Sequence, residues 1–153
     1  MEKKANNEDK IMWKVMIVDD EKLICKLVQA LVEWDKLGMQ MAAQAENAIQ
    51  ALDMLQQYRP DILITDIRMP GMDGLELIKN AKKICPELEI IIISGYAHFE
   101  YARNALSLGV GNYLLKPIKQ DELNETLRKI GERLDAKKSA QGMEMAERRV
   151  SES

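Results

Sequence analysis

The sequence predicts a doubly wound α/β domain built on a five-stranded parallel sheet. Short apolar runs of strand length alternate with longer segments whose apolar residues recur at helical spacing, in five strand–helix units. One of the five runs, residues 39–45, alternates apolar with polar residues, as an edge strand does. Because crossovers between parallel strands are right-handed, these observations favour the flavodoxin-like strand order 2-1-3-4-5.

Apolar runs and helical periodicity place each element. Strands are expected at residues 15–18, 39–45, 62–66, 90–93 and 113–115. Five helices are expected over residues 23–34, 49–58, 77–84, 99–108 and 123–134. The expected stops are Gly38, Pro60, Pro86 and Gly109. Asn47 and Asp73, each followed three residues later by Gln or Glu, indicate helix N-caps.

Three segments carry specific packing predictions. The first helix is expected to bury the apolar residues that recur at helical spacing, namely Leu23, Ile24, Leu27, Val28, Leu31 and Val32. The edge strand is expected to hold one apolar row against the core and to leave its other face wet, the row being Met39, Met41, Ala43 and Ala45. The last helix is expected to fray into a polar tail from about Ala136, with an extension of the helix through residues 136–153 as the alternative.

Length and composition suit one globular domain. A chain of 153 residues with 46% apolar and 31% charged residues can form one complete core. We therefore expect a disordered leader at residues 1–12, the domain at residues 13–135, and a polar tail or the start of a linker at residues 136–153. The two cysteines form no CxxC motif, so neither a zinc site nor a disulfide framework is indicated.

Charge and hydropathy exclude several kinds of partner. A net charge of −3 offers no basic footprint for nucleic acid, so this chain itself is expected to bind none. The charged N-terminus lacks the apolar segment of a signal peptide, and no apolar run approaches the length of a membrane span. A cytoplasmic protein without a membrane partner is the expectation.

Polar side chains follow four of the predicted strands. Asp19 and Asp20 follow the first strand, Asp66 the third, Ser94 the fourth and Lys116 the fifth. In a parallel sheet these ends share one edge, so three carboxylates, a hydroxyl and an ammonium should meet there. Like charges at close range are unfavourable unless a cation binds or their pKa values rise, and one lysine leaves an excess of negative charge. The set predicts a site for a hard divalent cation, with Mg²⁺ the natural choice.

The same set describes a phosphoryl-transfer site. A metal ion and Lys116 would neutralise phosphoryl oxygens, Ser94 would donate to another, and Asp66 would attack in line. Taken singly, each residue has an equally good structural explanation: an aspartate pair can cap a helix, and a lysine can simply be solvated. Their joint placement at successive strand ends favours the functional interpretation.

The motifs at these strand ends resemble those of receiver domains, the phosphoacceptor domains of bacterial two-component response regulators. The matching segments are residues 18–21 (VDDE), 66–74 (DIRMPGMDG), 94–96 (SGY) and 113–117 (YLLKP). The resemblance covers roughly residues 14–134 and implies the CheY-like version of the predicted fold. Residues 34–38 and 94–102 look most like receivers of AraC-type transcriptional regulators.

The resemblance implies a role for each matching position. Asp66 would accept a phosphoryl group from a phosphohistidine on a sensor histidine kinase. Asp20 would bind Mg²⁺ directly and Asp19 through water, while Asp66 and the backbone carbonyl of Arg68 would complete the protein ligands. Lys116 would pair with the Asp66 carboxylate and then with the phosphoryl oxygens.

The resemblance also implies a conformational switch. Ser94 would move to bond the phosphoryl group, and Tyr113 would rotate inward behind it. This movement would remodel the face formed by the fourth helix, fifth strand and fifth helix, where the family commonly dimerises or meets partners. The Lys116–Pro117 bond looks like the family's cis peptide.

One enzyme class remains as the alternative. Phosphatases of the haloacid dehalogenase type also use an aspartyl nucleophile, but they carry a DxD motif, whereas Asp66 is followed two residues later by Arg68. A flavodoxin-like FMN carrier lacks support because no phosphate-binding loop follows the first strand. The expectation is therefore not an enzyme with outside substrates but a signalling module that catalyses only its own phosphorylation and dephosphorylation. It would be a stand-alone receiver or a truncated transcription regulator.

Overall fold

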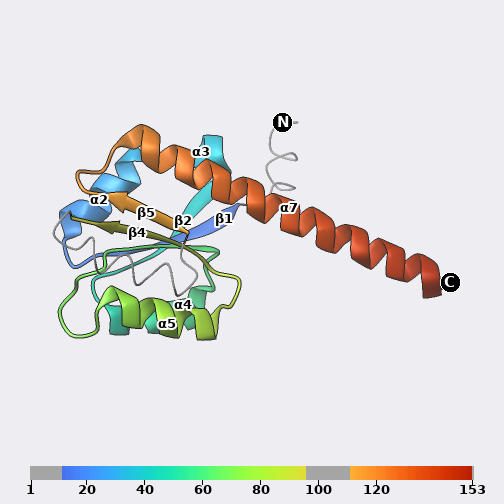
Figure 1. Cartoon of the computed structure of the whole chain (residues 1–153), viewed down its shortest axis with the longest axis horizontal. Helices are drawn as coiled ribbons and strands as arrows, with labels where there is room; N and C mark the ends of the chain where they lie inside the picture. The colour runs from blue at the N-terminus through green and yellow to red at the C-terminus, as the bar shows by residue number, and fades with distance from the viewer. Residues whose placement is uncertain (1–11, 96–110, 153) are drawn as a thin grey trace, which may run out of the picture.

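The fold is a five-stranded parallel sheet covered by helices on both faces (Figure 1). The computed structural model describes residues 12–95 and 111–152. The strands are β1 (Trp13–Val18), β2 (Met39–Ala45), β3 (Ile62–Thr65), β4 (Glu89–Ser94) and β5 (Asn112–Leu115). They pair in the order β2-β1-β3-β4-β5, and every pair is parallel, which confirms the predicted topology.

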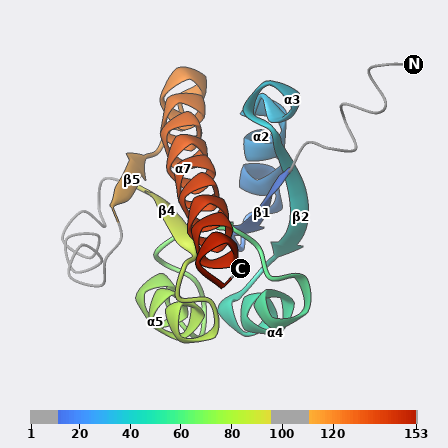
Figure 2. The same ribbon diagram turned by 90° about the vertical axis from the view of Figure 1, so that its right-hand side faces the viewer.

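Two helical layers enclose the sheet. The described helices are α2 (Lys22–Leu31), α3 (Trp34–Leu37), α4 (Ala48–Tyr58), α5 (Gly74–Ile84) and α7 (Gln120–Glu152). Figure 2 shows α2, α3 and α7 on one face of the sheet and α4 and α5 on the other. The helix expected over residues 99–108 lies outside the described residues. The predicted caps are confirmed, since Asn47 accepts from the Gln50 amide (2.8 Å) and Asp73 from the Glu76 amide (3.0 Å).

Each face of the sheet has its own apolar core. Leu63 and Ile67 belong to the core under α4 and α5, whereas Ile62 and Ile64 belong to the core under α2 and α7. Successive residues of a strand point to opposite faces, so a central strand that is apolar throughout serves both cores. All four residues of β3 are buried, and the strand order places β3 in the middle of the sheet.

The predicted single apolar row of β2 is wrong in one respect. The register between β1 and β2 shifts between Val15 and Met16, so that Val15 pairs with Met41 but Met16 pairs with Ala43. The extra residue is Ala42, and one inserted residue moves the following side chains to the other face. Met39 and Met41 therefore pack under α2 and α7, whereas Ala43 and Ala45 pack under α4 and α5. The predicted edge position of the strand is confirmed.

The predicted buried face of the first helix is also wrong in part. Cys25 and Val28 are the buried residues of α2, whereas Leu23 is 77% exposed and Leu27 40% exposed. Helix α2 also ends earlier than expected, at Leu31, and the separate short helix α3 follows before Gly38. Leu23 and Leu27 lie one turn apart, so together they form an apolar surface, here called the α2 patch.

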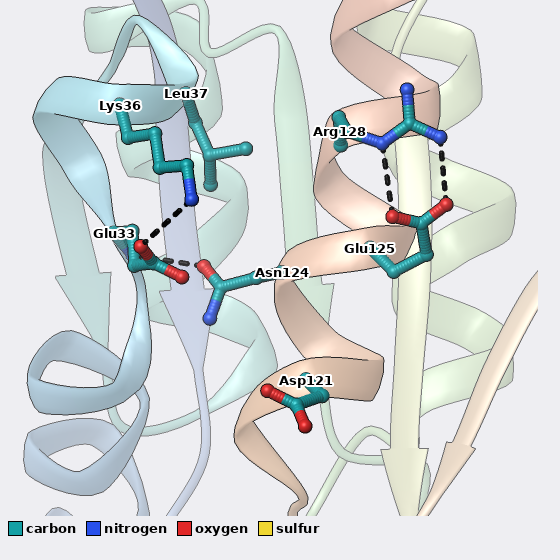
Figure 3. A pocket seen from close by; sticks show the side chains of 7 residues that line it. All are labelled: Glu33, Lys36, Leu37, Asp121, Asn124, Glu125 and Arg128. Atoms are coloured by element: carbon teal, nitrogen blue, oxygen red, sulfur yellow. Dashed lines mark hydrogen bonds and ion pairs between the residues drawn. The ribbon is translucent and has the colours of Figure 1, made fainter.

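Helix α7 is attached to the α2–α3 junction by one buried amide. The Asn124 side chain accepts from the Glu33 amide (2.8 Å) and donates to the carbonyls of Leu31 and Gln120 (both 2.9 Å). Figure 3 shows Asn124 reaching across from α7 beneath Glu33 and Lys36. The residues around it line an open pocket of about 340 Å³. The contact fixes the start of α7, and hence the segment from β5 that precedes it.

The expected fraying of the last helix is wrong. Helix α7 continues without a break to Glu152 and extends away from the sheet (Figure 1). Its side chains are exposed from Asp135 to Gly142, so no apolar face of that stretch is covered by the domain. A fully polar helical stretch has no hydrophobic periodicity, which is why the sequence pattern ended at Leu134. Within the described residues, no helix is both long and apolar enough to cross a membrane.

Candidate functional site

Three aspartates converge at the carboxyl edge of the sheet. Asp19 and Asp20 follow β1, and Asp66 follows the neighbouring strand β3. Each offers a carboxylate oxygen, and these oxygens all lie within 4.8 Å of one another. Asp19 is 2% exposed and Asp66 7% exposed, whereas Asp20 is exposed to solvent. The predicted convergence of these three residues is what the fold produces, because adjacent parallel strands end at the same edge.

The two oxygens of the Asp66 carboxylate have different partners. Oδ1 accepts from the backbone amides of Ile67 (2.6 Å) and Arg68 (3.3 Å). Oδ2 lies 3.1 Å from the ammonium of Lys116. The Thr65 hydroxyl donates to the Asp66 carbonyl (2.8 Å) and so holds the backbone beneath the carboxylate. The carboxylate is therefore fixed in orientation, with Oδ2 turned toward the open, charged side of the site.

Lys116 is a cation that contacts two members of the aspartate cluster. Its ammonium lies 3.6 Å from Asp19 and 3.1 Å from Asp66, and its backbone amide donates to the Ser94 carbonyl (2.8 Å). Burial by itself lowers the pKa of Lys116, but attraction to Asp19 and Asp66 outweighs it, so the net pKa is raised. Lys116 is thus firmly protonated. The peptide bond to Pro117 is cis, as predicted.

Asp19 has a raised pKa in this arrangement. Burial raises the pKa of Asp19 to about 6, and repulsion from Asp66 and Asp20 acts in the same direction. The Glu21 backbone amide, which donates to Asp19 (2.9 Å), and the Lys116 ammonium oppose the rise but do not cancel it. The folded protein therefore holds a carboxylate that is costly to ionise at neutral pH.

The donor set fits a divalent magnesium ion. The three carboxylates carry three negative charges and Lys116 one positive charge, which leaves two negative charges uncompensated. The side-chain donors of the cluster are oxygens, which Mg²⁺ prefers, and the exposed Asp20 leaves a side on which the ion can keep its water molecules. Repulsion from Asp66 and Asp20 adds to the rise that burial causes in the pKa of Asp19, and a bound cation would oppose this repulsion.

The other predicted site residues lie on neighbouring elements. Ser94 is buried at the end of β4, and its hydroxyl donates to the Gly95 carbonyl (3.2 Å). Tyr113 is half-buried on β5, where its ring packs against the core under α4 and α5. The Arg68 side chain is exposed, and its backbone amide bonds Asp66. The three aspartates thus lie close together and Lys116 contacts two of them, while Ser94 is joined to Lys116 through the backbone and Tyr113 lies on the neighbouring strand β5.

Sequence reasoning assigned no role to two residues that hold the site together. Thr65 is a buried polar residue whose hydroxyl bonds the Asp66 carbonyl. Gly74, the first residue of α5, has no room for a Cβ because that atom would lie 2.5 Å from the same carbonyl oxygen. A hydroxyl in the otherwise apolar run of residues 62–65 was an available signal for Thr65. No local pattern signals the close approach at Gly74.

Comparison with known proteins agrees with this geometry. The profile of the response regulator receiver domain matches residues 15–128. The chain is 40% identical over 119 residues to the transcriptional regulatory protein YesN of Bacillus subtilis, which covers 78% of this chain and 32% of YesN. It is 32% identical over 135 residues to the transcriptional regulatory protein HptR of Staphylococcus aureus, covering 88% of this chain and 53% of HptR. The chain spans only about a third to a half of the length of these relatives.

Solved structures show the same likeness. The receiver domain of AraT, a response regulator from Geobacillus stearothermophilus, superposes with a TM-score of 0.81 at 38% identity, covering 84% of this chain and 99% of that one. A two-component transcriptional regulator AraC from Clostridium phytofermentans gives a TM-score of 0.72 at 35% identity, covering 77% and 92%. From the matched motifs, the sheet order and these comparisons, the chain belongs to the receiver domain family of two-component response regulators.

Proposed function

We propose that this receiver accepts a phosphoryl group on Asp66 and signals the change through a conformational switch. The observation that carries the proposal is the asymmetry of the Asp66 carboxylate. Two backbone amides hold Oδ1, and Oδ2 faces Lys116 beside a second buried carboxylate. Fixed orientation and neighbouring positive charge are what in-line attack on a phosphorus atom requires.

In the proposed reaction, Asp66 is the nucleophile. Its free oxygen forms a bond to phosphorus while the bond between phosphorus and a histidine nitrogen of a sensor kinase breaks, and the electron pair of that bond stays on the histidine. The Lys116 ammonium pairs first with the Asp66 carboxylate and, after transfer, with the phosphoryl oxygens. Hydrolysis of the resulting acyl phosphate returns the domain to its starting state, so the domain catalyses only its own phosphorylation and dephosphorylation. Membership of the receiver family gives no support to the phosphatase alternative.

Mg²⁺ is the proposed cofactor. Asp19, Asp20 and Asp66, with the backbone carbonyl of Arg68, are the residues that would hold it. The ion would supply the positive charge that the aspartate cluster lacks and would neutralise phosphoryl oxygens during transfer. Asp19 and Asp20 would bind the ion and orient it. Asp19 is buried, and its carboxylate lies close to the Asp66 carboxylate that would react.

The α2 patch supports a protein partner on this side of the domain. Leu23 and Leu27 are exposed immediately after the aspartates that follow β1, and the exposed Lys22 and Lys26 flank them. Apolar residues one turn apart suit a groove between helices, and flanking lysines suit acidic residues around it. We propose that the kinase helix carrying the phosphohistidine docks here, which brings the donor to Asp66.

The proposed output face lies beyond β5. Ser94 lies at the end of β4 and Tyr113 on β5, so movements of these two side chains would transmit the phosphorylation of Asp66 to the output face. A cavity of about 340 Å³ lies on that face, and it is lined by Tyr113, Leu115, Lys116, Pro117, Lys119 and Glu122. Homodimerisation through this face is part of the proposal. Because the relatives are transcriptional regulators, we also propose a cytoplasmic location and an output in transcription.

Acetyl phosphate tests the central step. The wild-type chain, incubated with acetyl phosphate and Mg²⁺, should gain one phosphoryl group by intact mass spectrometry, and Asp66→Asn should gain none. Omitting Mg²⁺ should abolish the adduct. Sustained turnover of a phosphomonoester, or an adduct of equal yield in Asp66→Asn, would contradict the proposal.

A matched pair of variants tests the docking surface. Leu23 and Ile49 have similar exposure, 77% and 67%, but lie on helices that cover opposite faces of the sheet. With a purified phosphorylated kinase that phosphorylates the wild-type chain, Leu23→Ala should slow transfer about tenfold. Ile49→Ala should not, and both variants should react with acetyl phosphate at the wild-type rate. Equal transfer to both variants would remove the α2 patch from the kinase interface.

A further inference from the structure

The start of helix α5 is packed directly against the turn that carries Asp66. An ideal Cβ at Gly74 would lie 2.5 Å from the Asp66 carbonyl oxygen and 2.6 Å from the Ile67 Cα. Both are backbone atoms, so they can make room only if the turn itself moves. At Gly131, another buried glycine, a Cβ would meet only the terminal methyl group of Met39 at 3.2 Å, and a flexible side chain can yield.

Gly74 is bonded to the same turn. Its backbone amide donates to the Ile67 carbonyl at 2.8 Å, and the Asp73 side chain caps the helix by accepting from the Glu76 amide. The positive end of α5 therefore points at the Ile67 carbonyl. On the other side, the Thr65 hydroxyl holds the Asp66 carbonyl at 2.8 Å. The backbone of the turn is clamped between β3 and the first residue of α5.

The clamped backbone supplies the donors that orient the carboxylate. The amides of Ile67 and Arg68 bond Oδ1 of Asp66, and this leaves Oδ2 toward Lys116. Moving the Ile67 Cα to admit a Cβ at Gly74 would shift both amides and with them the nucleophile. The same shift would turn the Arg68 carbonyl, a proposed ligand of Mg²⁺.

We propose that Gly74 is a positioning residue for phosphoryl transfer. Because Gly74 has no side chain, the start of α5 can pack directly against the turn after β3. This packing fixes the position of the Asp66 carboxylate and the geometry of the Mg²⁺ site. The inference rests on the proposed function of Asp66, and it adds a residue that touches neither the phosphoryl group nor the ion. A displacement of about 1 Å at a reacting group lowers rates by up to about 100-fold.

Gly74→Ala tests the proposal, with Gly131→Ala as the matched control. Both add one methyl group to a buried helical glycine, but only the first meets backbone atoms of the site. At a temperature where thermal unfolding shows each variant fully folded, Gly74→Ala should bind Mg²⁺ at least fivefold more weakly by calorimetry. It should also react with acetyl phosphate at least tenfold more slowly, and Gly131→Ala should stay within twofold of wild type in both. A purely structural role would lower the melting temperature of Gly74→Ala and leave the Mg²⁺ affinity of the folded protein unchanged, which would overturn the proposal.

A measurement on the wild-type chain covers the case in which Gly74→Ala does not fold. The Gly74 amide should exchange its hydrogen at least threefold more slowly when Mg²⁺ is added, since ion and helix hold one turn. Unchanged exchange at Gly74 in saturating Mg²⁺ would overturn the inference. These readouts do not depend on phosphorylation, so a wild-type chain that binds Mg²⁺ but rejects acetyl phosphate would contradict the proposed function and leave the role of Gly74 to be judged separately.

Discussion

The two edges of the sheet use charge in opposite ways. At the amino edge, Trp13 donates to Asp135, Arg133 pairs with Glu89, and Lys137 pairs with Glu87, and each contact matches one donor with one acceptor. Apart from Trp13 and Glu89, which are half-buried, these side chains are exposed, so water screens the charges. At the carboxyl edge, three carboxylates share one ammonium, and two of the carboxylates are buried.

The amino edge therefore has a structural role and the carboxyl edge a functional one. The amino-edge pairs fasten α7 where it leaves the domain, and exposed pairs of this kind contribute little free energy each. At the carboxyl edge, burial, with a smaller contribution from repulsion by Asp66 and Asp20, raises the pKa of Asp19, so its ionisation is a cost to the metal-free fold. A ligand that brings positive charge would relieve part of that cost while Asp19 stays ionised. The comparison therefore predicts that substitutions at the carboxyl edge change stability and Mg²⁺ response together, whereas those at the amino edge change neither by much.

The largest effect on stability is expected from removing the Lys116 ammonium, which pairs with Asp19 and Asp66. Lys116→Met leaves Asp19 and Asp66 facing each other without compensation. In metal-free buffer at pH 7.5 it should lower the free energy of unfolding by about 2 kcal/mol, measured by urea denaturation. Mg²⁺ should recover part of this loss. Lys119→Met, an exposed lysine three residues later, should change the free energy by less than about 0.5 kcal/mol. Equal losses of stability in the two variants would contradict the proposed role of charge at the carboxyl edge.

An intermediate effect of opposite sign is expected at Asp19. Its folded pKa of about 6 lies above the ordinary aspartate pKa of 3.8, so ionisation favours the unfolded state as pH rises between these values. Asp19→Asn removes that ionisation while its side-chain oxygen can still accept from the Glu21 amide. In metal-free buffer at pH 8 the variant should be more stable than wild type by about 1 kcal/mol. The difference should shrink as pH falls through 6 and vanish near pH 4.

Mg²⁺ supplies the control for Asp19. Saturating Mg²⁺ should raise the melting temperature of wild type more than that of Asp19→Asn, because the variant has lost a carboxylate of the site. A stability difference that stayed constant from pH 4 to pH 8 would show that Asp19 is not the residue that titrates.

The smallest effect is expected at the amino edge. Arg133 and Glu89 form an ion pair in which the two side chains are 48% and 18% exposed. Arg133→Ala should lower the free energy of unfolding by about 0.5 kcal/mol, and the loss should shrink in 1 M salt. Mg²⁺ affinity should be unchanged. A weaker Mg²⁺ affinity in this variant would mean that the two edges are energetically coupled through α7.

The site was more predictable than the surfaces around it. Asp19, Asp20, Asp66 and Lys116 each follow a strand that the apolar pattern reveals, and the parallel order brings such ends together without further information. Leu23 and Leu27 were wrongly expected to be buried, because they are spaced four residues apart just as Ile24 and the buried Val28 are. Periodicity identifies an apolar stripe, but the width of the stripe that is covered depends on which elements pack against it.

The sequence by itself determined the sheet order, the caps of α4 and α5 and the chemistry gathered at the carboxyl edge, because these follow from local patterns and from the handedness of crossovers. Only the tertiary structure decided that β2 changes face at Ala42, that Leu23 stays in solvent, and that α7 continues past Ala136. It also decided that Gly74 touches the Asp66 backbone. Each of these depends on distances between segments far apart in the chain, and no local pattern of residue types encodes such distances.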